Sequence, residues 1–529
     1  MPNTKKYIPL AISTALAVGI LIGSKLNNSA SSDLTASNYK KNKLNKLIDY
    51  IDFEYVDQVN TDSIVDITVN KILDNLDPHS VYIPQQELKD NKENMSGNFV
   101  GIGVSFYTYK DTIAVIRPIK NGPSHKAGIV SGDRILIANK DTLFGKKANN
   151  TDITKKLKGP LNSTIKLKVY RKSKDSLINV TLKRSKIPIK SVDAAYMLSN
   201  KLGYIKINRF AETTYKEFKT NLNSLLKQGA TQLAIDLRDN PGGFLHIAEQ
   251  ILDELLEDNT LLLFTKNKRG DIQKSFATNK GIFKNKELFI LINEKSASAS
   301  EIVAGALQDN DKGTIIGRRS YGKGLVQRDM SLGDGSVVRL TISRYYTPTG
   351  RSIQRQYKKG NKDYFDEYFE RLSSGELTDS MKIKVSEDLK FKTPKGKIVY
   401  GGGGIIPDVF IPITTQNPHK ETLNYLHKSG FIRYFIFEVL DKNRNAFNSA
   451  SRQDFIDNFA VPNSLVIDFQ TYLNKHTTSN IELASYNKDV KHYIKATLAN
   501  QLYDPEALEE ILNKKDAMIN KVIELSNAK

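Results

Sequence analysis

The sequence predicts an α+β protein with several domains: a helical N-terminal region, a β-rich module, an α/β core and a helical C-terminal extension. Three observations support this fold class. A chain of 529 residues is long enough for three or four domains. The spacing of apolar residues changes along the chain from the period of a helix to that of a strand and, near the C-terminus, back again. A hydrophobic content of 39% with 26% charged residues is typical of globular proteins.

Residues 1–26 have the pattern of an export signal or a membrane anchor. Lys5 and Lys6 precede residues 7–24, a segment that contains no charged residue and is mostly apolar. Its length lies between the core of a signal peptide and a short membrane-spanning helix. Since no clear cleavage site follows, we expect an anchor in the inner membrane, with the rest of the chain on the periplasmic side of the cell envelope. The alternative is a cleaved signal and a soluble or secreted chain.

The net charge of +20 comes mainly from lysines scattered along the chain. Because no base-stacking aromatic motif accompanies this charge, we predict no nucleic-acid partner and favour a general lysine bias or attraction to an anionic membrane surface. The chain has no cysteine, which excludes disulfides, iron–sulfur clusters and cysteine-based zinc sites. No H-E-x-x-H or similar cluster is present, so we expect neither a metal nor another cofactor.

Residues 27–96 form the expected N-terminal helical region. Apolar residues recur at helical spacing between residues 43 and 76. The segment that follows, residues 73–82, includes His79, which we interpret as a capping or packing residue rather than a catalytic one.

A β-rich module is expected over residues 97–187. One helix is predicted near residues 124–128, and the predicted strands are residues 112–116, 135–138, 165–170 and 178–182. The order of these features is similar to that of a PDZ domain, which binds an extended C-terminal peptide as an added strand. The resemblance implies that the N–H groups of four residues hold the peptide carboxylate, namely Gly101, Ile102, Gly103 and Val104. A small β-barrel, in which the glycines only serve turns, is the alternative.

The α/β core is expected over residues 188–412. Its predicted helices are residues 215–228 and 244–256, and its predicted strands are residues 202–207, 233–237, 287–292 and 314–316. A hairpin turn at residues 333–335 joins two further strands, residues 325–330 and 337–345. Residues 358–392 are rich in charge and are interpreted as a surface insertion.

Amphipathic helices are predicted in the last region, residues 413–529. We expect this region to serve dimerisation, as a homodimer, or the docking of an adaptor protein. The predicted helices are residues 431–440, 464–473, 490–502 and 505–525.

The segment between the buried strand 287–292 and the next helix contains a candidate nucleophile, Ser298. Only small residues surround this serine, so the chain can turn sharply from strand to helix with little bulk around one hydroxyl. Backbone N–H groups at the N-terminus of a helix stabilise negative charge, which suits an oxyanion. A helix cap built from small residues is the alternative for this segment taken alone.

A serine nucleophile requires a base, and Lys323 is the candidate. No histidine stands in a recognisable serine-hydrolase frame, and no G-x-S-x-G motif is present. A lysine can replace histidine when burial lowers its pKa from about 10.4 by up to about 3–5 units. Gly322 and Gly324 flank Lys323 and leave it room to approach a hydroxyl. If residues 324–330 form a strand, Lys323 and Gln327 project to the same face, and the Gln327 amide orients the amine.

Two glycine-rich segments resemble nucleotide-binding loops without meeting their requirements. Residues 317–324 nearly form a P-loop, but glycine stands where a serine or threonine has to hold Mg²⁺. Residues 401–404 lack the spacing of a dinucleotide-binding loop and are interpreted as a flexible turn. We therefore predict no nucleotide site.

The motif S-A-S-A-S-E-I at residues 296–302, followed by G-K-G-x-V-Q at residues 322–327, resembles the carboxy-terminal processing peptidases, the tail-specific serine proteases of family S41. The resemblance extends over roughly residues 44–409. It implies a crotonase-like α/β core, with the nucleophile at Ser298, the general base at Lys323 and the lysine-orienting amide at Gln327. It also implies an oxyanion hole formed by the N–H group of Ala299 and that of a glycine in the Asn-Pro-Gly-Gly turn at residues 240–243, for which we favour Gly243.

The sequence therefore predicts a serine endopeptidase that cleaves envelope proteins near their C-terminus, with polypeptides that have free C-termini as its substrates. The PDZ module would recruit those C-termini. Two alternatives belong to other classes: a non-catalytic PDZ scaffold that only binds C-termini, and an acyl hydrolase on a crotonase-like core. The first requires an inactive site, and the second leaves the PDZ module without a role.

Overall fold

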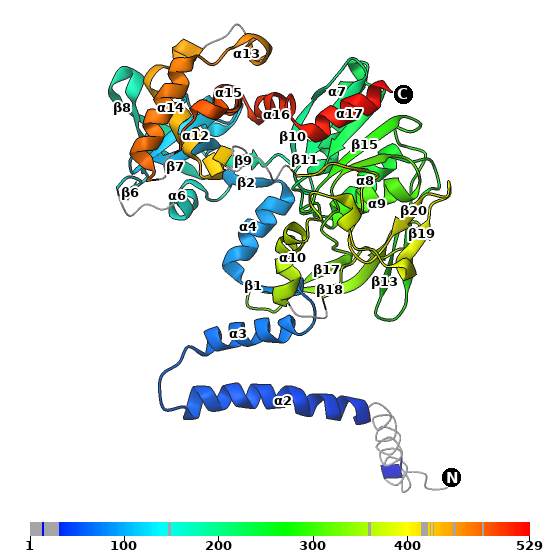
Figure 1. Ribbon diagram of the computed structural model, residues 1–529. Helices are drawn as coiled ribbons and strands as arrows, with labels where there is room; N and C mark the ends of the chain where they lie inside the picture. Colours follow the sequence, from blue (N-terminus) through cyan, green and yellow to red (C-terminus); the bar gives the residue numbers. More distant parts are fainter. Residues whose placement is uncertain are drawn as a thin grey trace, which may run out of the picture. The chain divides into compact units, whose positions relative to one another are not determined.

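The computed structural model describes residues 13–14, 31–145, 150–357, 361–413, 422–423, 425–426, 428–447, 451–478 and 481–528 (Figure 1). Apart from Ser13 and Thr14, the expected membrane anchor at residues 7–24 lies outside these ranges. None of the helices within the described ranges has both the length and the apolar content needed to span a membrane. The chain divides into two units, Met1–Tyr82 and Ile83–Lys529.

In the first unit, residues 31–82 of the described chain contain the helices α2 (Ser31–Glu54) and α3 (Thr61–Asp74). The Asn60 side chain caps α3 by accepting the N–H of Ser63 at 3.0 Å. The helical periodicity predicted between residues 43 and 76 is confirmed, with a break between the two helices. His79 lies in a turn in which its N–H donates to the Asp77 carboxylate at 2.9 Å.

The second unit begins within β1 (Val81–Ile83), continues through α4 (Gln85–Ser96) and then forms the PDZ domain. Its main sheet has the order β3-β4-β5-β7-β8, with β6 (Asp141–Thr142) beside β5. These strands are β3 (Val104–Tyr109), β4 (Thr112–Pro118), β5 (Arg134–Ala138), β7 (Thr164–Arg171) and β8 (Ser176–Lys183). A second pair and two helices complete the domain: β2 (Asn98–Gly101), β9 (Ser185–Pro188), α5 (Pro123–Lys126) and α6 (Asn150–Leu157). The four predicted strands and the first helix are confirmed, and α6 was not predicted.

The core is a six-stranded sheet with the order β10-β11-β12-β15-β16-β21. Only the pair β10 and β11 is antiparallel, and the remaining pairs are parallel. The strands are β10 (Val192–Met197), β11 (Leu202–Ile207), β12 (Gln232–Asp236), β15 (Glu287–Ile292), β16 (Thr314–Gly317) and β21 (Val409–Phe410). Successive residues of a strand point to opposite faces of the sheet, and the central strands are apolar at nearly every position. Both faces of the sheet are therefore apolar and have to be covered by other elements.

Helices cover the two faces of this sheet. On one face, Ile235 and Ile290 pack against α7 (Thr214–Lys227), α8 (Leu245–Leu255) and α9 (Ala299–Asp309). All eleven residues of α9 are buried. On the other face, Phe289 and Leu291 pack against Met518, Ile519 and Val522 of α17 (Ala517–Asn527). The C-terminal helix therefore belongs to the core.

A second sheet has five strands, with β1 at its edge in the order β1-β18-β13-β14 and with β17 also paired to β18. Its strands besides β1 are β13 (Leu261–Asn267), β14 (Ile272–Phe276), β17 (Leu325–Ser331) and β18 (Val337–Tyr346). The predicted hairpin at residues 333–335 is confirmed. The pair β13 and β14 was not predicted.

The interpretation of residues 358–392 as a surface insertion is wrong for part of this segment. It contains α10 (Asn361–Ser373) and ends in β19 (Lys390–Lys392), which pairs with β20 (Ile398–Tyr400). The side chains of Tyr364, Arg371, Glu376 and Leu377 are buried. The charged groups among them pair with one another inside the protein, which a count of charges in the sequence does not reveal.

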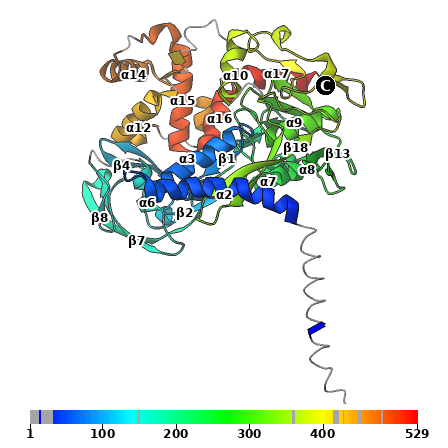
Figure 2. The same ribbon diagram turned by 90° about the horizontal axis from the view of Figure 1, so that it is seen from below.

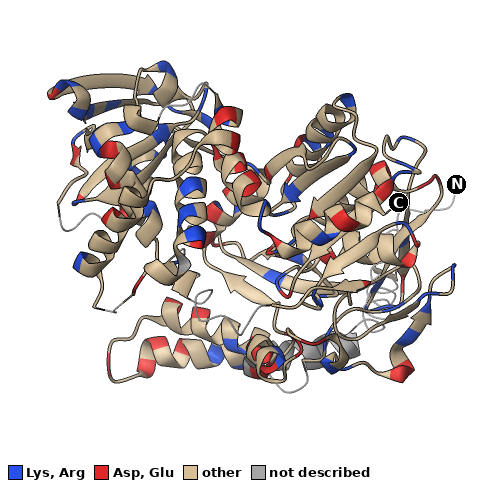
Figure 3. Ribbon diagram, turned by 45° about the horizontal axis from the view of Figure 1, so that its top comes forward, with Lys and Arg blue, Asp and Glu red and all other residues tan. Residues whose placement is uncertain are grey.

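The C-terminal extension forms α12 (Phe431–Asn443), α13 (Arg452–Asn458), α14 (Asn463–His476), α15 (Asn487–Leu502), α16 (Pro505–Asn513) and α17. The first four share an apolar core, and α12 also packs on the PDZ sheet, where Phe437 contacts Ala114 and Ile116 (Figure 2). The predicted helices are confirmed, with residues 505–525 divided into α16 and α17. Basic and acidic residues are interspersed along the elements, as expected for scattered lysines (Figure 3).

Candidate active site

The site lies where the parallel neighbours β12 and β15 end, at the same edge of the sheet. The turns that follow these strands are bonded to each other. The Asn240 carbonyl accepts both the Ala297 N–H and the Ser300 hydroxyl at 3.0 Å. The Asn293 side chain accepts the Asp239 N–H at 2.9 Å. The Pro-Gly-Gly turn and the loop of the candidate nucleophile are therefore one local structure.

Ser298 occupies the position that caps α9 and has a strained backbone, with φ 56° and ψ −113°. Residues other than glycine rarely adopt positive φ, and such strain persists only where the surroundings hold it. The side chain of Ser298 is half-buried. A sharp, strained turn from strand to helix is the geometry that the small residues of this segment predict.

The carboxylate of Glu301 holds this turn and the loop of Lys323 together. One oxygen accepts the N–H groups of Ser298 and Lys323, each at 2.8 Å. The other accepts the Gly322 N–H and the Ser320 hydroxyl, each at 2.6 Å. Burial raises the pKa of Glu301, and these four hydrogen bonds to the charged form offset part of the rise. Since two N–H groups share one oxygen, the Ser298 and Lys323 nitrogens lie within two hydrogen-bond lengths of each other.

Tyr345 on β18 is a second side chain that contacts both loops. Its buried hydroxyl lies 2.9 Å from the Lys323 carbonyl and 3.3 Å from the Ser298 carbonyl. Burial, together with the nearby Glu301 charge, raises the pKa of Tyr345 far above its ordinary value, so the hydroxyl stays protonated and can donate. The predicted nucleophile and the predicted base thus share two buried anchors.

Gln327 lies on β17, but its geometry differs from the simple alternation that the sequence suggested. The strand begins at Leu325, after Lys323, and its pairing with β18 shifts between Val326 and Gln327. Such an irregularity re-aims a side chain, so alternation does not carry from residue 323 to residue 327. The amide nitrogen of Gln327 is buried and has no hydrogen-bond partner among the described residues.

The two predicted oxyanion donors lie beside Ser298. Within the described ranges, neither the Gly243 N–H nor the Ala299 N–H has an acceptor in the protein. The neighbouring Gly242 has φ +100°, and a Cβ there would lie 2.7 Å from the Ala297 carbonyl oxygen and 2.9 Å from the Ala299 nitrogen. Only glycine permits this approach, which brings the turn after β12 against the first residue of α9.

The predicted carboxylate-binding loop of the PDZ domain connects β2 to β3. Gly101 ends β2, Val104 begins β3, and Gly103 has φ +74°. The carbonyls of Ile102 and Gly103 accept N–H groups from within the domain, both at 3.0 Å. β3 lies at an edge of its sheet, where an extended peptide can add as a strand.

Sequence reasoning assigns no individual role to Glu301 or Tyr345, and it predicts the turn of residues 240–243 as a source of N–H groups but not the contacts that Asn240 and Gly242 make. For Glu301 a signal was present, because Ser298 and Glu301 have the S-x-x-E spacing of a capping box. Arg238 pairs with the buried Asp236 at 2.6 Å and supports the end of β12. No group of three or more metal-ligating side chains occurs among the described residues.

Three sequence families match parts of the chain. Peptidase family S41 matches residues 201–361, the PDZ domain matches residues 100–182, and a family of unknown function, DUF8443, matches residues 422–504. The first match contains the strained serine, the glycine-flanked lysine and the two open N–H groups. A serine-type peptidase with a PDZ domain is the class of protein that this fold and site define.

Curated relatives narrow the class. The carboxy-terminal-processing protease of Bartonella bacilliformis is 33% identical over 305 residues, which are 57% of this chain and 69% of the relative. The carboxy-terminal processing protease CtpB of Bacillus subtilis is 32% identical, over 60% of this chain and 66% of the relative. The carboxy-terminal processing protease CtpA of the same organism is 29% identical, over 79% of this chain and 89% of the relative. The chain belongs to peptidase family S41, among the carboxy-terminal processing serine proteases.

Solved structures of related proteins also match. The photosystem II D1 C-terminal processing protease is 25% identical, over 70% of this chain and 86% of that chain, with a TM-score of 0.37. The PDZ domain of a carboxy-terminal protease from Vibrio cholerae was solved in complex with a peptide. It is 27% identical, over 17% of this chain and 97% of that chain, with a TM-score of 0.16.

Proposed function

We propose that this protein is an endopeptidase in which Ser298 and Lys323 form a catalytic dyad, and that it cleaves envelope proteins near their C-terminus. The observation that carries the proposal is the shared anchoring of the two residues by Glu301 and Tyr345. Two buried side chains that each contact both loops leave little freedom for one loop to move without the other. Such rigidity is what a nucleophile and its base require.

The proposed reaction uses Ser298 as the nucleophile and Lys323 as the base. Neutral Lys323 takes the proton of the Ser298 hydroxyl while its oxygen attacks the scissile carbonyl carbon. The oxyanion accepts the N–H groups of Ala299 and Gly243. The Lys323 ammonium then gives its proton to the leaving amine, and the peptide bond breaks to leave an ester on Ser298. Lys323 then deprotonates a water molecule, which attacks the ester carbonyl carbon. The ester C–O bond breaks, the Ser298 oxygen takes the proton back from the Lys323 ammonium, and Gln327 orients the amine throughout.

The PDZ domain would recruit the substrate through its free C-terminus. An extended peptide would add to the open edge of β3, and its carboxylate would accept N–H groups from the loop of Ile102 and Gly103. A C-terminus held in this way places the cleaved bond a limited length of chain upstream. This accounts for cleavage near the C-terminus without a highly selective pocket at the dyad.

The location of the protein in the envelope is part of the proposal. Residues 7–24 would anchor the chain in the inner membrane, with the protease on the periplasmic side. Deletion of residues 1–30 should move the protein from the membrane fraction to the soluble fraction of cells. A wild-type chain that is found in the soluble fraction at its full length would contradict the anchor.

The test of the dyad is cleavage of an unfolded protein such as casein. Ser298→Ala and Lys323→Ala should each abolish product while the melting temperature stays close to that of the wild type. Lys323→Arg should be equally inactive, because a guanidinium keeps its proton. Lys295→Ala is the matched control, since Lys295 lies in the same loop as Ser298 but is exposed. Substantial activity in either alanine variant would disprove the dyad.

The same assay separates the alternatives. A PDZ scaffold would bind C-terminal peptides and yield no product over a long incubation. An acyl hydrolase would turn over small esters and leave polypeptides intact. Mass spectrometry of cellular proteins, compared between the wild type and Ser298→Ala, would identify the substrates by their altered C-termini.

A further inference from the structure

The guanidinium of one residue on α10, Arg371, binds the backbone carbonyl groups of the loop that precedes Lys323. Arg371 donates to the carbonyls of Arg319 and Ser320 at 3.2 and 2.9 Å and lies 3.5 Å from that of Tyr321. The side chain is only 3% exposed. Three consecutive peptide groups are therefore oriented by one residue from a helix that lies more than 40 positions further along the chain.

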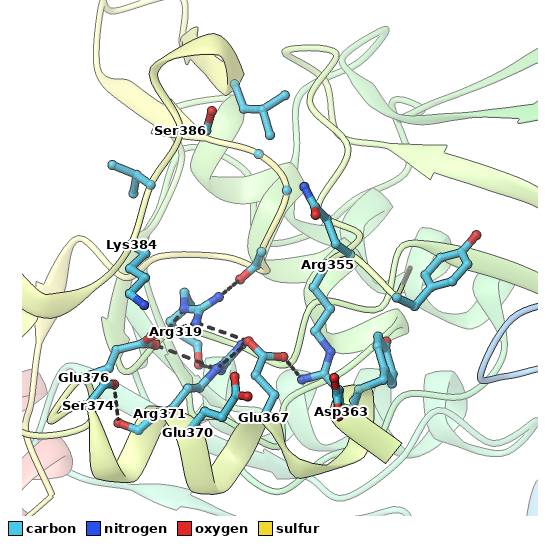
Figure 4. A pocket seen from close by; sticks show the side chains of 18 of the residues that line it. Arg319, Arg355, Asp363, Glu367, Glu370, Arg371, Ser374, Glu376, Lys384 and Ser386 are labelled. Carbon is cyan, nitrogen blue, oxygen red and sulfur yellow. Dashed lines mark hydrogen bonds and ion pairs between the residues drawn. The ribbon is translucent and has the colours of Figure 1, made fainter. Parts of the chain in front are cut away.

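Two carboxylates, Glu367 and Glu376, pair with Arg371 at 3.0 and 3.8 Å and also pair with neighbouring arginines (Figure 4). Glu367 bonds to Arg371 at 3.0 Å and to Arg319 at 3.3 Å, and it also contacts Arg355. Glu376 bonds to Arg319 at 2.7 Å. All five side chains are less than one-fifth exposed, so removing one would leave a partner buried without compensation. The network lines a cavity of about 510 Å³.

The opposite side of the same loop faces an anion. Glu301 accepts the N–H groups of Gly322 and Lys323, whereas Arg371 binds the carbonyls that precede them. The peptide group that joins Tyr321 to Gly322 lies between the two charges, since its N–H donates to Glu301 and its carbonyl lies 3.5 Å from Arg371. Charged partners make stronger hydrogen bonds than neutral ones, so Glu301 and Arg371 together restrain the orientation of the loop from opposite ends.

Arg355 attaches the loop to α10 at a second point. Its N–H donates to the Gly322 carbonyl at 3.0 Å. Its guanidinium is stacked between the rings of Tyr321 and Tyr364, with 4.0 and 3.8 Å to the two ring centres. Tyr321 belongs to the loop and Tyr364 to α10, so this contact bridges the two elements directly.

We propose that α10 holds the general-base loop from the side opposite the nucleophile, and that Arg371 is a positioning residue for Lys323. The inference rests on the proposed Ser298–Lys323 dyad. A displacement of about 1 Å in a catalytic group can cost about 100-fold in rate. The charge-rich segment after residue 358 thereby acquires a role in catalysis without touching the substrate.

The test is Arg371→Lys, which keeps the charge but not the planar set of donors that reaches several carbonyls at once. We expect kcat on a quenched fluorescent peptide to fall about 10- to 100-fold while KM stays within about twofold. Activity is measured well below the melting temperature of the variant, so that its folded fraction is complete. Asp366→Asn is the matched control, because Asp366 is an exposed residue of the same helix. In Arg371→Ala, guanidinium ion at low millimolar concentration should restore part of kcat.

The outcomes separate this inference from the proposed function. Wild-type kcat in folded Arg371→Lys, or a change confined to KM, would overturn the role of Arg371. If Arg371→Lys does not fold, Glu367→Gln decides by the same kcat and KM measurement, because it removes a partner of Arg371 and keeps the guanidinium. Activity retained in Lys323→Ala would instead disprove the dyad itself.

Discussion

At the level of single residues, the Glu301 carboxylate connects the two loops of the candidate site. Glu301 accepts four hydrogen bonds, and its donors include the backbones of both predicted catalytic residues. The sequence predicts Ser298 and Lys323 as catalytic residues because each lies in a short recognisable motif, residues 296–302 and 322–327. It does not reveal that Glu301 joins them, because that contact forms only when two loops 20 or more residues apart fold together. Tyr345 reaches the site from another sheet and has no local signal.

Replacing Glu301 by glutamine should disable the site. The amide presents its NH₂ group to donors that need an acceptor, so at least two buried donors lose their partner at about 1–3 kcal/mol each. We expect the melting temperature to fall and cleavage of casein to drop at least about 100-fold. Glu257→Gln, at an exposed position, is the control. Full activity in Glu301→Gln would show that the anchoring by this carboxylate is not required.

Gly242 provides a second prediction at this scale. A methyl group at this position meets the Ala297 carbonyl oxygen and the Ala299 nitrogen, so Gly242→Ala should push the two oxyanion donors apart. Loss of one such donor costs about 100- to 1,000-fold in kcat, and we expect an effect of this size. Gly270→Ala is the control, since Gly270 also has positive φ, at +91°, but has open space around it. Equal kcat values for the two variants would contradict the proposed oxyanion hole.

At the scale of elements, several strands were predictable from an apolar run that is bounded by turns, although β13 was not. β11 and β15 match their predicted bounds, because strands buried on both faces read as continuous apolar segments. α10 was missed because buried charges that pair with one another have the same composition as a solvated surface. The irregular pairing of β17 was also missed, because a bulge depends on the partner strand.

The charge network on α10 gives a pH dependence with a definite sign. Burial raises the pKa of Glu367, but Arg371, Arg355 and Arg319 together outweigh this, and the pKa lies below its ordinary value of 4.5. A group whose pKa is lowered in the folded state stabilises the fold above its ordinary pKa. That contribution is lost as the pH falls below about 4.5 and through the folded-state value.

Glu367→Gln should therefore lower the melting temperature at pH 7 and have a smaller effect at pH 3. Thermal unfolding of the variant and the wild type at the two pH values measures this difference. Asp366→Asn should follow the wild type at both. A destabilisation by Glu367→Gln that is equal at pH 7 and pH 3 would show that the ionised carboxylate does not contribute.

At the scale of the whole molecule, the C-terminal extension connects the PDZ domain to the protease core. α12 lies on the PDZ sheet, where Asp441 pairs with Arg134 at 2.9 Å and with Lys172 at 2.7 Å. α17 covers one face of the core sheet. The amphipathic patterns predicted these helices, but only the fold shows that their apolar faces pack against other parts of the same chain. Pairing between distant segments is the information that a single sequence does not carry.

The central claim is that the amine of Lys323 activates the hydroxyl of Ser298. The most direct measurement is the rate at which a fluorophosphonate probe forms an adduct, followed by intact mass spectrometry and peptide mapping. Lys323→Met leaves the hydrogen bond to Glu301 available, because that bond uses the Lys323 backbone N–H. We predict one adduct, on Ser298, in the wild type, and a rate at least about 100-fold lower in Lys323→Met. An adduct on another residue, or an unchanged rate in Lys323→Met, would contradict this account.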